Sequence, residues 1–168
     1  MAWVVFSLSF VRASGHVSLS AQDVNGHPVV LNGSGHYTVV MYTNPDLEDA
    51  SRKVTLALDS YRSRSDFALV RIVDLRGGVP PAMRGLVRTE IRKEQANESA
   101  RLRKEGVSSG DQAPIIPDFD GSTLDALGWD SIYDQVHLVV YDPHGHEIKR
   151  LENANDPRQV TKVVNAIL

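Results

Sequence analysis

The sequence of 168 residues contains no cysteine. A chain without thiols forms no disulfide and offers no thiolate, which is the nucleophile of thiol–disulfide exchange. Cysteine-ligated zinc sites and iron–sulfur clusters are excluded for the same reason. The absence of this one residue type therefore removes thiol redox enzymes from the candidate functions.

Long apolar runs and a strong charge bias are also missing. No stretch reaches the ~18 consecutive apolar residues that indicate a transmembrane helix. The net charge is −3, so nothing in the composition favours a nucleic acid or an anionic membrane as partner. Apolar residues make up 42% and charged residues 23% of the chain, which is typical of a globular protein, and the length fits one domain.

The first residues carry almost no charge. Residues 2–11 are apolar or small, as in the central region of a secretory signal, but the basic segment that opens such signals is missing. Alternating large side chains in the same stretch are also typical of a strand. We expect residues 1–15 to be a remnant of a signal peptide or an N-terminal strand, and residues 16–168 to form a single domain. A signal remnant implies export to the periplasm, and otherwise the chain is expected in the cytoplasm.

Apolar runs predict the strands. The segments His36–Tyr42, Phe67–Val73 and Val136–Asp142 are largely apolar, as strands covered on both faces should be, and we predict that they form the centre of a sheet. An Asn25-Gly26 turn predicts a hairpin in front of them. The further strands predicted from the sequence are His16–Ala21, Pro28–Leu31, Pro114–Phe119 and His146–Glu152.

Helices are predicted between these strands. The first begins at Asn44 or Asp46, either of which can cap it, and runs to about Arg64. A long polar helix over 82–104 has its apolar positions in the first half, so we expect the half over 93–105 to project into solvent or to fray. A short helix over 123–127 is capped by Ser122, and a last helix begins at Asp156-Pro157. Strands that alternate with helices indicate a mixed sheet with helices on both faces.

This layout resembles the thioredoxin-like superfamily, in its peroxiredoxin and exported-redoxin branch. The segment Val17–Leu31 resembles the N-terminal hairpin of that branch, and Tyr37–Arg52 resembles the core strand with its redox loop and helix. Residues 115–150 resemble the strand–helix insert and the C-terminal hairpin. Within the superfamily, Val70–Arg88 is most similar to the YtfJ-type family of small exported proteins. The resemblance implies an α/β, thioredoxin-like mixed sheet with helices on both faces and an N-terminal β-hairpin.

The departures from the superfamily decide the expected function. Thioredoxins carry Trp-Cys-x-x-Cys where this chain has Thr-Asn-Pro-Asp-Leu-Glu, and the cis-proline of the superfamily aligns near a valine. The resemblance thus implies a non-catalytic binding or accessory protein that lacks thiol redox chemistry and needs no cofactor. The residues of its vestigial active-site loop are Thr43, Asn44, Pro45, Asp46, Glu48, Asp49 and Val136.

The start of the first core helix has two interpretations. A helix N-terminus favours anions, but Asp46, Glu48 and Asp49 place their own negative charge there. These carboxylates either only cap and solubilise the helix, or they form a binding face for another protein or for a small neutral or basic ligand. No nucleic-acid partner is expected, and the oligomeric state is left open.

An alternative function is a cysteine-independent enzyme or a metal-binding protein that uses His and Asp side chains. Its candidate residues are Asp46, Glu48, His137, His144 and His146. A His-x-His pair can ligate zinc or copper, but His144 and His146 flank a glycine in a predicted turn, where polar residues are common. These two histidines are therefore weak candidates, and no metal site is expected. The pair Asp118 and Asp120 lacks the ligand pattern of an EF-hand.

The long helix carries two rows of charge. Arg84, Arg88 and Arg92 recur every four residues, and a second row is formed by Glu90, Glu94 and Glu98. Such rows are either a solvated face or a surface for an acidic partner or a phosphate. The spacing of Glu98 and Arg101 predicts an ion pair within the helix.

We predict that the purified protein neither reduces insulin disulfides nor turns over hydroperoxides, because both reactions need a thiolate. Turbidity and peroxide-consumption assays check this, with a thioredoxin and a thiol peroxidase as positive controls. Turnover above the protein-free blank would contradict the exclusion.

Overall fold

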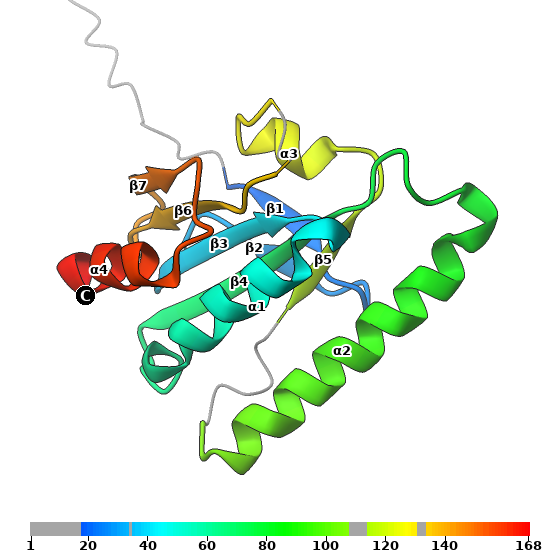
Figure 1. Cartoon of the computed structure of the whole chain (residues 1–168). Coiled ribbons are helices and arrows are strands. Elements are labelled where there is room, and N and C mark those ends of the chain that lie inside the picture. Colours follow the sequence, from blue (N-terminus) through cyan, green and yellow to red (C-terminus); the bar gives the residue numbers. More distant parts are fainter. Residues whose placement is uncertain (1–17, 34, 108–113, 131–133) are drawn as a thin grey trace, which may run out of the picture.

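The computed structural model describes residues 18–33, 35–107, 114–130 and 134–168 (Figure 1). The expected signal remnant or strand over 1–15 lies outside the described residues. In the described part, no helix has the length and apolar character needed to cross a bilayer.

A five-stranded mixed sheet forms the centre of the molecule, in the order β5-β4-β3-β6-β7. The strand β3 (Tyr37–Thr43) pairs in parallel with β4 (Phe67–Asp74) and antiparallel with β6 (His137–Tyr141), which confirms the three predicted central strands. The strand β5 (Ile115–Asp118) extends the parallel part, and β7 (Glu147–Leu151) is the antiparallel edge strand. The parallel strands β3, β4 and β5 therefore end at one edge of the sheet.

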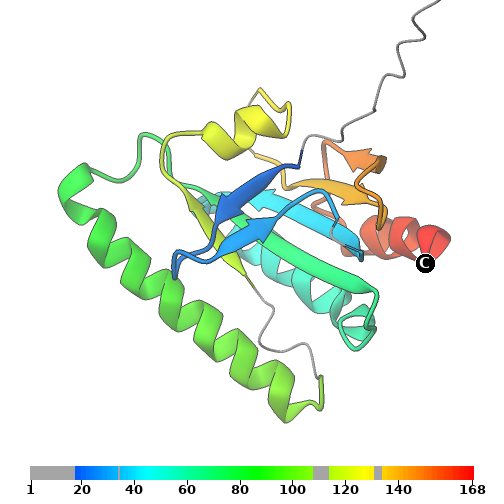
Figure 2. The same ribbon diagram turned by 180° about the vertical axis from the view of Figure 1, so that it is seen from behind.

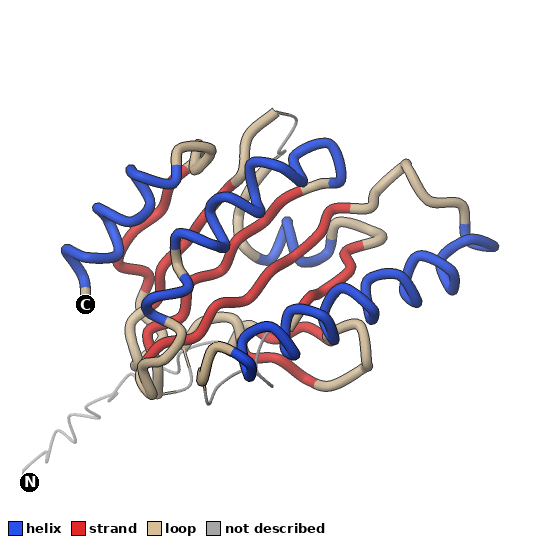
Figure 3. Tube along the Cα trace, turned by 60° about the horizontal axis from the view of Figure 1, so that its bottom comes forward, coloured by secondary structure: helices blue, strands red, loops and turns tan. Residues whose placement is uncertain are grey.

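Helices cover both faces of this sheet, as expected. Helices α1 (Glu48–Ala57) and α4 (Pro157–Ile167) lie side by side on one face (Figure 3). The short α3 (Ser122–Ala126) packs on the other face, together with the hairpin of β1 (Ser20–Gln22) and β2 (Pro28–Val30) (Figure 2). Successive residues of a strand point to opposite faces, so each central strand feeds both cores. The core under α1 and α4 contains Val39, Met41 and Leu138, and the core under α3 contains Val40, Tyr42 and Val139.

Two glycines fix the hairpin against the sheet. Gly33 (φ 75°) lies so close to the β6–β7 turn that a Cβ would overlap the carbonyl oxygen of Asp142. Gly145 (φ 90°) lies in that turn, where a Cβ would come within 2.7 Å of the carbonyl oxygen of Asn32. Each position needs both the left-handed backbone and the missing side chain. The contact joins the end of β2 to the turn between β6 and β7.

The ends of the first helix and of the first hairpin strand differ from the predictions. The first helix does not run to Arg64, because α1 ends at Ala57 and a separate 3₁₀ turn, η2 (Asp59–Tyr61), follows it. This turn lets the ring of Tyr61 pack on Phe67 at a centroid distance of 5.8 Å. The first hairpin strand is observed only at 20–22, whereas 16–21 was predicted.

The caps also differ in part from the predictions. Asn44, and not Asp46, caps the 3₁₀ turn η1 (Pro45–Leu47) that leads into α1: its Oδ1 accepts a hydrogen bond from the amide of Leu47 at 3.1 Å. Ser122 does not cap α3: the amides of Thr123 and Leu124 donate to Asp118 at the end of the preceding strand instead. The predicted cap of α4 is confirmed, since Asp156 accepts a hydrogen bond from the amide of Arg158.

Helix α2 (Arg84–Lys104), preceded by the 3₁₀ turn η3 (Pro81–Met83), runs along the β5 side of the sheet (Figure 1). The prediction that its second half projects into solvent or frays is wrong, since Leu102 is fully buried and packs with Val107. In the first half, Ile91 is buried and packs with Val87, as its apolar positions suggest, but Leu86 is 56% exposed. The single buried leucine of this helix therefore lies near its C-terminus.

Polar contacts hold the second half of α2. Glu98 accepts a hydrogen bond at 2.6 Å from Arg62, whose side chain is buried, and burial lowers the pKa of that guanidinium. Arg101 pairs with Asp59 at 2.8 Å and with Glu98 at 3.0 Å, which confirms the predicted pair within the helix. Further along, Gln95 accepts a hydrogen bond from the amide of Ile115 in β5. Apolar periodicity does not register contacts of this kind, so it missed the packing of the second half.

The two leucines of α2 give a matched test. Leu102→Ala is expected to lower the free energy of unfolding by about 2–5 kcal/mol, because it leaves a cavity at a fully buried position. Leu86→Ala makes the same chemical change at an exposed position of the same helix and is expected to stay within about 0.5 kcal/mol of the parent. Urea unfolding measures both. Equal losses for the two variants would contradict the described packing of α2.

Candidate functional site

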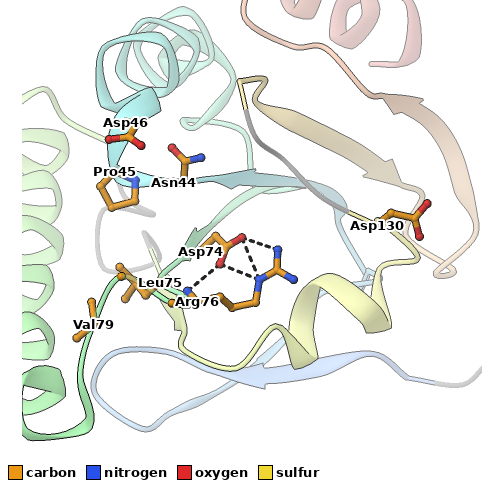
Figure 4. Close-up of a pocket in the computed structure, with 10 residues that line it drawn as sticks. Asn44, Pro45, Asp46, Asp74, Leu75, Arg76, Val79 and Asp130 are labelled. Carbon is orange, nitrogen blue, oxygen red and sulfur yellow. Dashed lines mark hydrogen bonds and ion pairs between the residues drawn. The ribbon is translucent and has the colours of Figure 1, made fainter.

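A cleft of about 710 Å³ lies at the edge of the sheet where the parallel strands end (Figure 4). Ligands of open α/β sheets commonly bind beyond these carboxyl ends. The cleft is formed by the loop after β3, the loop after β4 and one residue that follows α3. Its lining consists of Asn44, Pro45, Asp46, Asp74, Leu75, Arg76, Gly77, Gly78, Val79 and Asp130.

The loop after β3 forms one wall. Asn44 has extended backbone (φ −132°, ψ 171°), and its side chain is used to cap η1. Pro45 takes the first helical position, where its fixed φ fits and no amide is left unpaired. Asp46 follows within the first turn and is exposed. The cap thus fixes the backbone and leaves a carboxylate free to face solvent at the rim of the cleft.

The loop after β4 carries an ion pair at the centre of the cleft (Figure 4). Arg76 contacts Asp74 through Nε at 3.0 Å and through Nη2 at 2.8 Å, and its backbone amide donates to the same carboxylate at 3.0 Å. The hydrogen bond to Asp74 raises the pKa of Arg76 above its ordinary value. The two groups neutralise each other, so the pair adds polarity and little net charge.

A buried hydrogen-bond network lies beneath the cleft. The carboxylate of Asp118, at the end of β5, accepts hydrogen bonds from the hydroxyl of Tyr42 at 2.8 Å and from the amides of Gly121, Thr123 and Leu124. Burial and the hydrogen bond to Asp118 raise the pKa of Tyr42 above its ordinary value. Gly121 (φ 85°) lies against Arg76, since a Cβ there would come within 2.5 Å of Cδ of the arginine. The network thereby fixes the surface on which the central ion pair rests.

The charge of the cleft is negative. Asp46, Asp74 and Asp130 contribute three carboxylates, against the single guanidinium of Arg76. Since that guanidinium is paired with Asp74, the unbalanced charge lies on Asp46 and Asp130. This arrangement can attract a cationic group and hold it by charge-assisted hydrogen bonds, and it disfavours a phosphate or a carboxylate.

Three of the seven residues predicted for the vestigial loop line the cleft, namely Asn44, Pro45 and Asp46. The other four are not part of its lining. Thr43 is buried in the sheet, and Glu48 and Asp49 belong to the exposed first turn of α1, where Asp49 pairs with Arg52 at 3.2 Å.

Val136, which the resemblance aligns with the cis-proline, has its side chain completely buried in the core under α1 and α4. Its amide donates to Oδ1 of Asn155 at 2.8 Å, and its carbonyl accepts from the amide of Ala154 at 2.7 Å. No peptide bond among the described residues is cis. Both backbone groups of this residue are therefore already used within the fold.

The residues of the alternative, metal-binding or enzymatic, function are not brought together. His137 opens β6 opposite Tyr42 and stacks on Trp129 at a centroid distance of 5.2 Å. His144 and His146 lie in the turn at the other end of β6, where His146 contacts Asp142 at 2.9 Å. In the ranges that the structure describes, no three His, Asp or Glu side chains are placed to hold a metal ion.

Seven of the ten lining residues escaped the sequence analysis, namely the segment 74–79 and Asp130. The end of the second central strand was predicted next to Asp74, and the carboxyl ends of neighbouring parallel strands meet at one edge. This adjacency of strand ends could have indicated that the loop after β4 belongs to the cleft. Nothing in the sequence pattern indicated Asp130.

The comparisons with known proteins show the fold. No family model and no curated protein matches the sequence. Among solved structures, DsbF from MTB is 18% identical with a TM-score of 0.57, over 90% of this chain and 96% of its own.

Two further solved structures are similar. The exposed lipoprotein thioredoxin Etrx1 from Streptococcus pneumoniae is 12% identical with a TM-score of 0.56, over 89% of this chain and 99% of its own. A secreted Mycobacterium tuberculosis disulfide oxidoreductase homologous to E. coli DsbE is 13% identical with a TM-score of 0.53, over 89% and 96%. The chain thus has a thioredoxin-like fold, in a sequence that contains no cysteine.

Two tyrosines of the sheet test the network under the cleft. Tyr42→Phe is expected to lower the free energy of unfolding by about 1–3 kcal/mol, because the buried Asp118 carboxylate loses one of its donors. Tyr141→Phe is the matched control, since the Tyr141 hydroxyl makes no hydrogen bond in the described part of the chain, and it is expected to change stability by less than about 0.5 kcal/mol. Chemical denaturation compares them. Indistinguishable stabilities would show that the Tyr42 hydrogen bond contributes little.

Proposed function

We propose that this protein is a non-catalytic binding or accessory protein that takes a neutral or basic ligand, such as a segment of another protein, in the cleft at the edge of the sheet. The observation that carries the proposal is the composition of that cleft. It lies beyond the ends of β3 and β4, and three carboxylates face a single guanidinium that is already paired.

The geometry of the cleft suits a chain segment. Gly77 and Gly78 form part of its rim without side chains, so backbone groups there are accessible to an extended ligand. Asp46 and Asp130 lie in two different loops, and both are exposed. A basic side chain that enters between these loops can meet either carboxylate, and Arg76 adds donors for a carbonyl oxygen of a neutral ligand.

The cellular setting is part of the same proposal. We place the protein in the exported branch of thioredoxin-like proteins, close to the YtfJ type, with one domain over 16–168 and a periplasmic location. The apolar residues 2–11 support export. Two of the similar solved structures are described as an exposed lipoprotein and as a secreted protein, which supports the same location.

A charge-neutral variant of the cleft tests the binding proposal. The Asp46→Asn/Asp130→Asn protein is titrated into fluorescent (Lys-Ala)₃ and (Glu-Ala)₃ peptides with blocked ends, and anisotropy is measured. The parent is expected to bind the basic peptide saturably and the acidic one not at all. The double variant should weaken binding of the basic peptide roughly two- to thirtyfold, since each exposed ion pair contributes about 0.2–1 kcal/mol.

The matched control changes the net charge equally. The Asp49→Asn/Asp125→Asn protein also loses two exposed carboxylates, but neither residue lines the cleft. Its affinity for the basic peptide should stay within twofold of the parent. Tighter binding of the acidic peptide, or equal weakening by both double variants, would overturn the proposed cleft.

A further inference from the structure

Two arginines at the start of α2 are arranged around one aromatic ring. The guanidinium carbon of Arg84 lies 5.2 Å, and that of Arg88 4.9 Å, from the ring centroid of Phe119, which follows β5. Within the described ranges, neither arginine forms an ion pair or a hydrogen bond with a carboxylate, and Nε of Arg84 is buried without an acceptor. Elsewhere in the chain, arginines such as Arg76 and Arg150 are paired with a neighbouring carboxylate.

This arrangement is costly without an anion. Like charges four residues apart on a helix repel each other, and a buried N–H without an acceptor loses its hydrogen bond to water and gains none in return. The ring of Phe119 favours the two cations by its π-face and restricts their rotamers. Arg84 and Arg88 are thus two preorganised donor groups that have no carboxylate partner among the described residues.

Both arginines line a second cleft, of about 550 Å³, which is distinct from the one at the ends of β3 and β4. It is bordered by α2, by the start of α3 and by β1, and Figure 2 shows β1 between these two helices. Its walls are more polar than apolar: the partly exposed Leu19 and Ala21 supply apolar surface, beside the two arginines and the polar residues Ser122 and Thr123. Its volume of several hundred Å³ is in the range of small-ligand sites.

Two carboxylates of the same cleft limit the charge of the ligand. Asp118 is occupied by the hydroxyl of Tyr42 and three amides, and Asp120 accepts a hydrogen bond from the amide of Ser122 at 3.0 Å. Neither carboxylate neutralises the arginines, but both oppose added negative charge. A monoanion is therefore favoured over a dianion such as phosphate, and the planar guanidinium fork matches a carboxylate.

We propose that the cleft between α2, α3 and β1 binds a small organic carboxylate with an apolar body, with Arg84 and Arg88 holding the carboxylate and Leu19 and Ala21 lying against the apolar part. This site does not depend on the function proposed for the other cleft, whose lining is negative, whereas the two arginines and two carboxylates of this cleft balance each other. The proposal assigns two arginines of the α2 row to ligand binding, whereas the alternative interpretation of that row was a solvated face.

Sodium benzoate is the probe, with acetate and inorganic phosphate as comparisons, all at one ionic strength. Titration calorimetry measures affinity, and ¹⁵N NMR of the full chain follows the arginine Nε–Hε signals. Benzoate is expected to bind saturably, at least fivefold more tightly than acetate or phosphate. The Hε signal of Arg84 should move downfield as its Nε gains an acceptor, and shifted amides should surround Phe119.

The Arg84→Gln/Arg88→Gln protein should bind benzoate at least tenfold more weakly. Arg92→Gln is the matched control, because this exposed arginine of the same row does not line the cleft, and its affinity should stay within twofold of the parent. If the double variant does not fold, the location of the chemical-shift changes in the parent protein tests the proposed site on its own. No saturation, shifts centred elsewhere, tighter binding of phosphate, or unchanged affinity in the double variant would each overturn the proposal.

Discussion

The buried carboxylate of Asp118 joins β5 and α3, which follow each other in the sequence, to the distant strand β3. It ends β5, receives the hydroxyl of Tyr42 from β3, and takes the place of a capping side chain for α3. A buried carboxylate is tolerated only where such donors compensate its lost hydration. Phe119 and Gly121 are close to Asp118 in the sequence. The hydrogen bonds of the Asp118 carboxylate therefore help to position both Gly121, which lies against Arg76, and the Phe119 ring, which lies against Arg84.

This thioredoxin-like fold contains no cysteine, and its parallel strands end at one edge of the sheet. There the loop after β3 forms a capped turn with the exposed Asp46, and both backbone groups of Val136 are bonded to Ala154 and Asn155. In the proposed function, the cleft at this edge therefore binds by its shape and its negative charge. The second proposed site, between α2, α3 and β1, also uses shape and charge, but it favours an anion where the first favours a cation.

The sequence was a good guide wherever apolar residues determine the structure. The central strands are continuous apolar runs that must be covered on both faces, so they were predicted within a residue or two at each end. The helix after Asp156-Pro157 followed from local capping chemistry. Both signals are local, and neither depends on the order of the strands.

Where polar contacts or distant neighbours decide, sequence patterns were insufficient. The docking of α2 depends on the pairs of Glu98 and Arg101 with residues near the end of α1, which look like a solvated face in the sequence. Likewise the cleft needs two loops about thirty positions apart, and only the pairing of β3 with β4 brings Asp74 beside Asn44. Asp118 appeared as one of two unremarkable acids, because its partners are backbone amides and a tyrosine 76 positions away.

The contact between α2 and β5 has a consequence for the outer edges of the sheet. At the β5 edge, the amide of Ile115 donates to Gln95 and its carbonyl accepts from Val24, so these groups are not free to pair with another strand. At the β7 edge, charged side chains oppose pairing with another strand, because an incoming strand would have to desolvate Lys149 and the Glu147–Arg150 pair. The two edges thus avoid intermolecular strand pairing by different means, occlusion on one side and charge on the other. Neutral substitutions are therefore far more hazardous for aggregation on β7 than on β5.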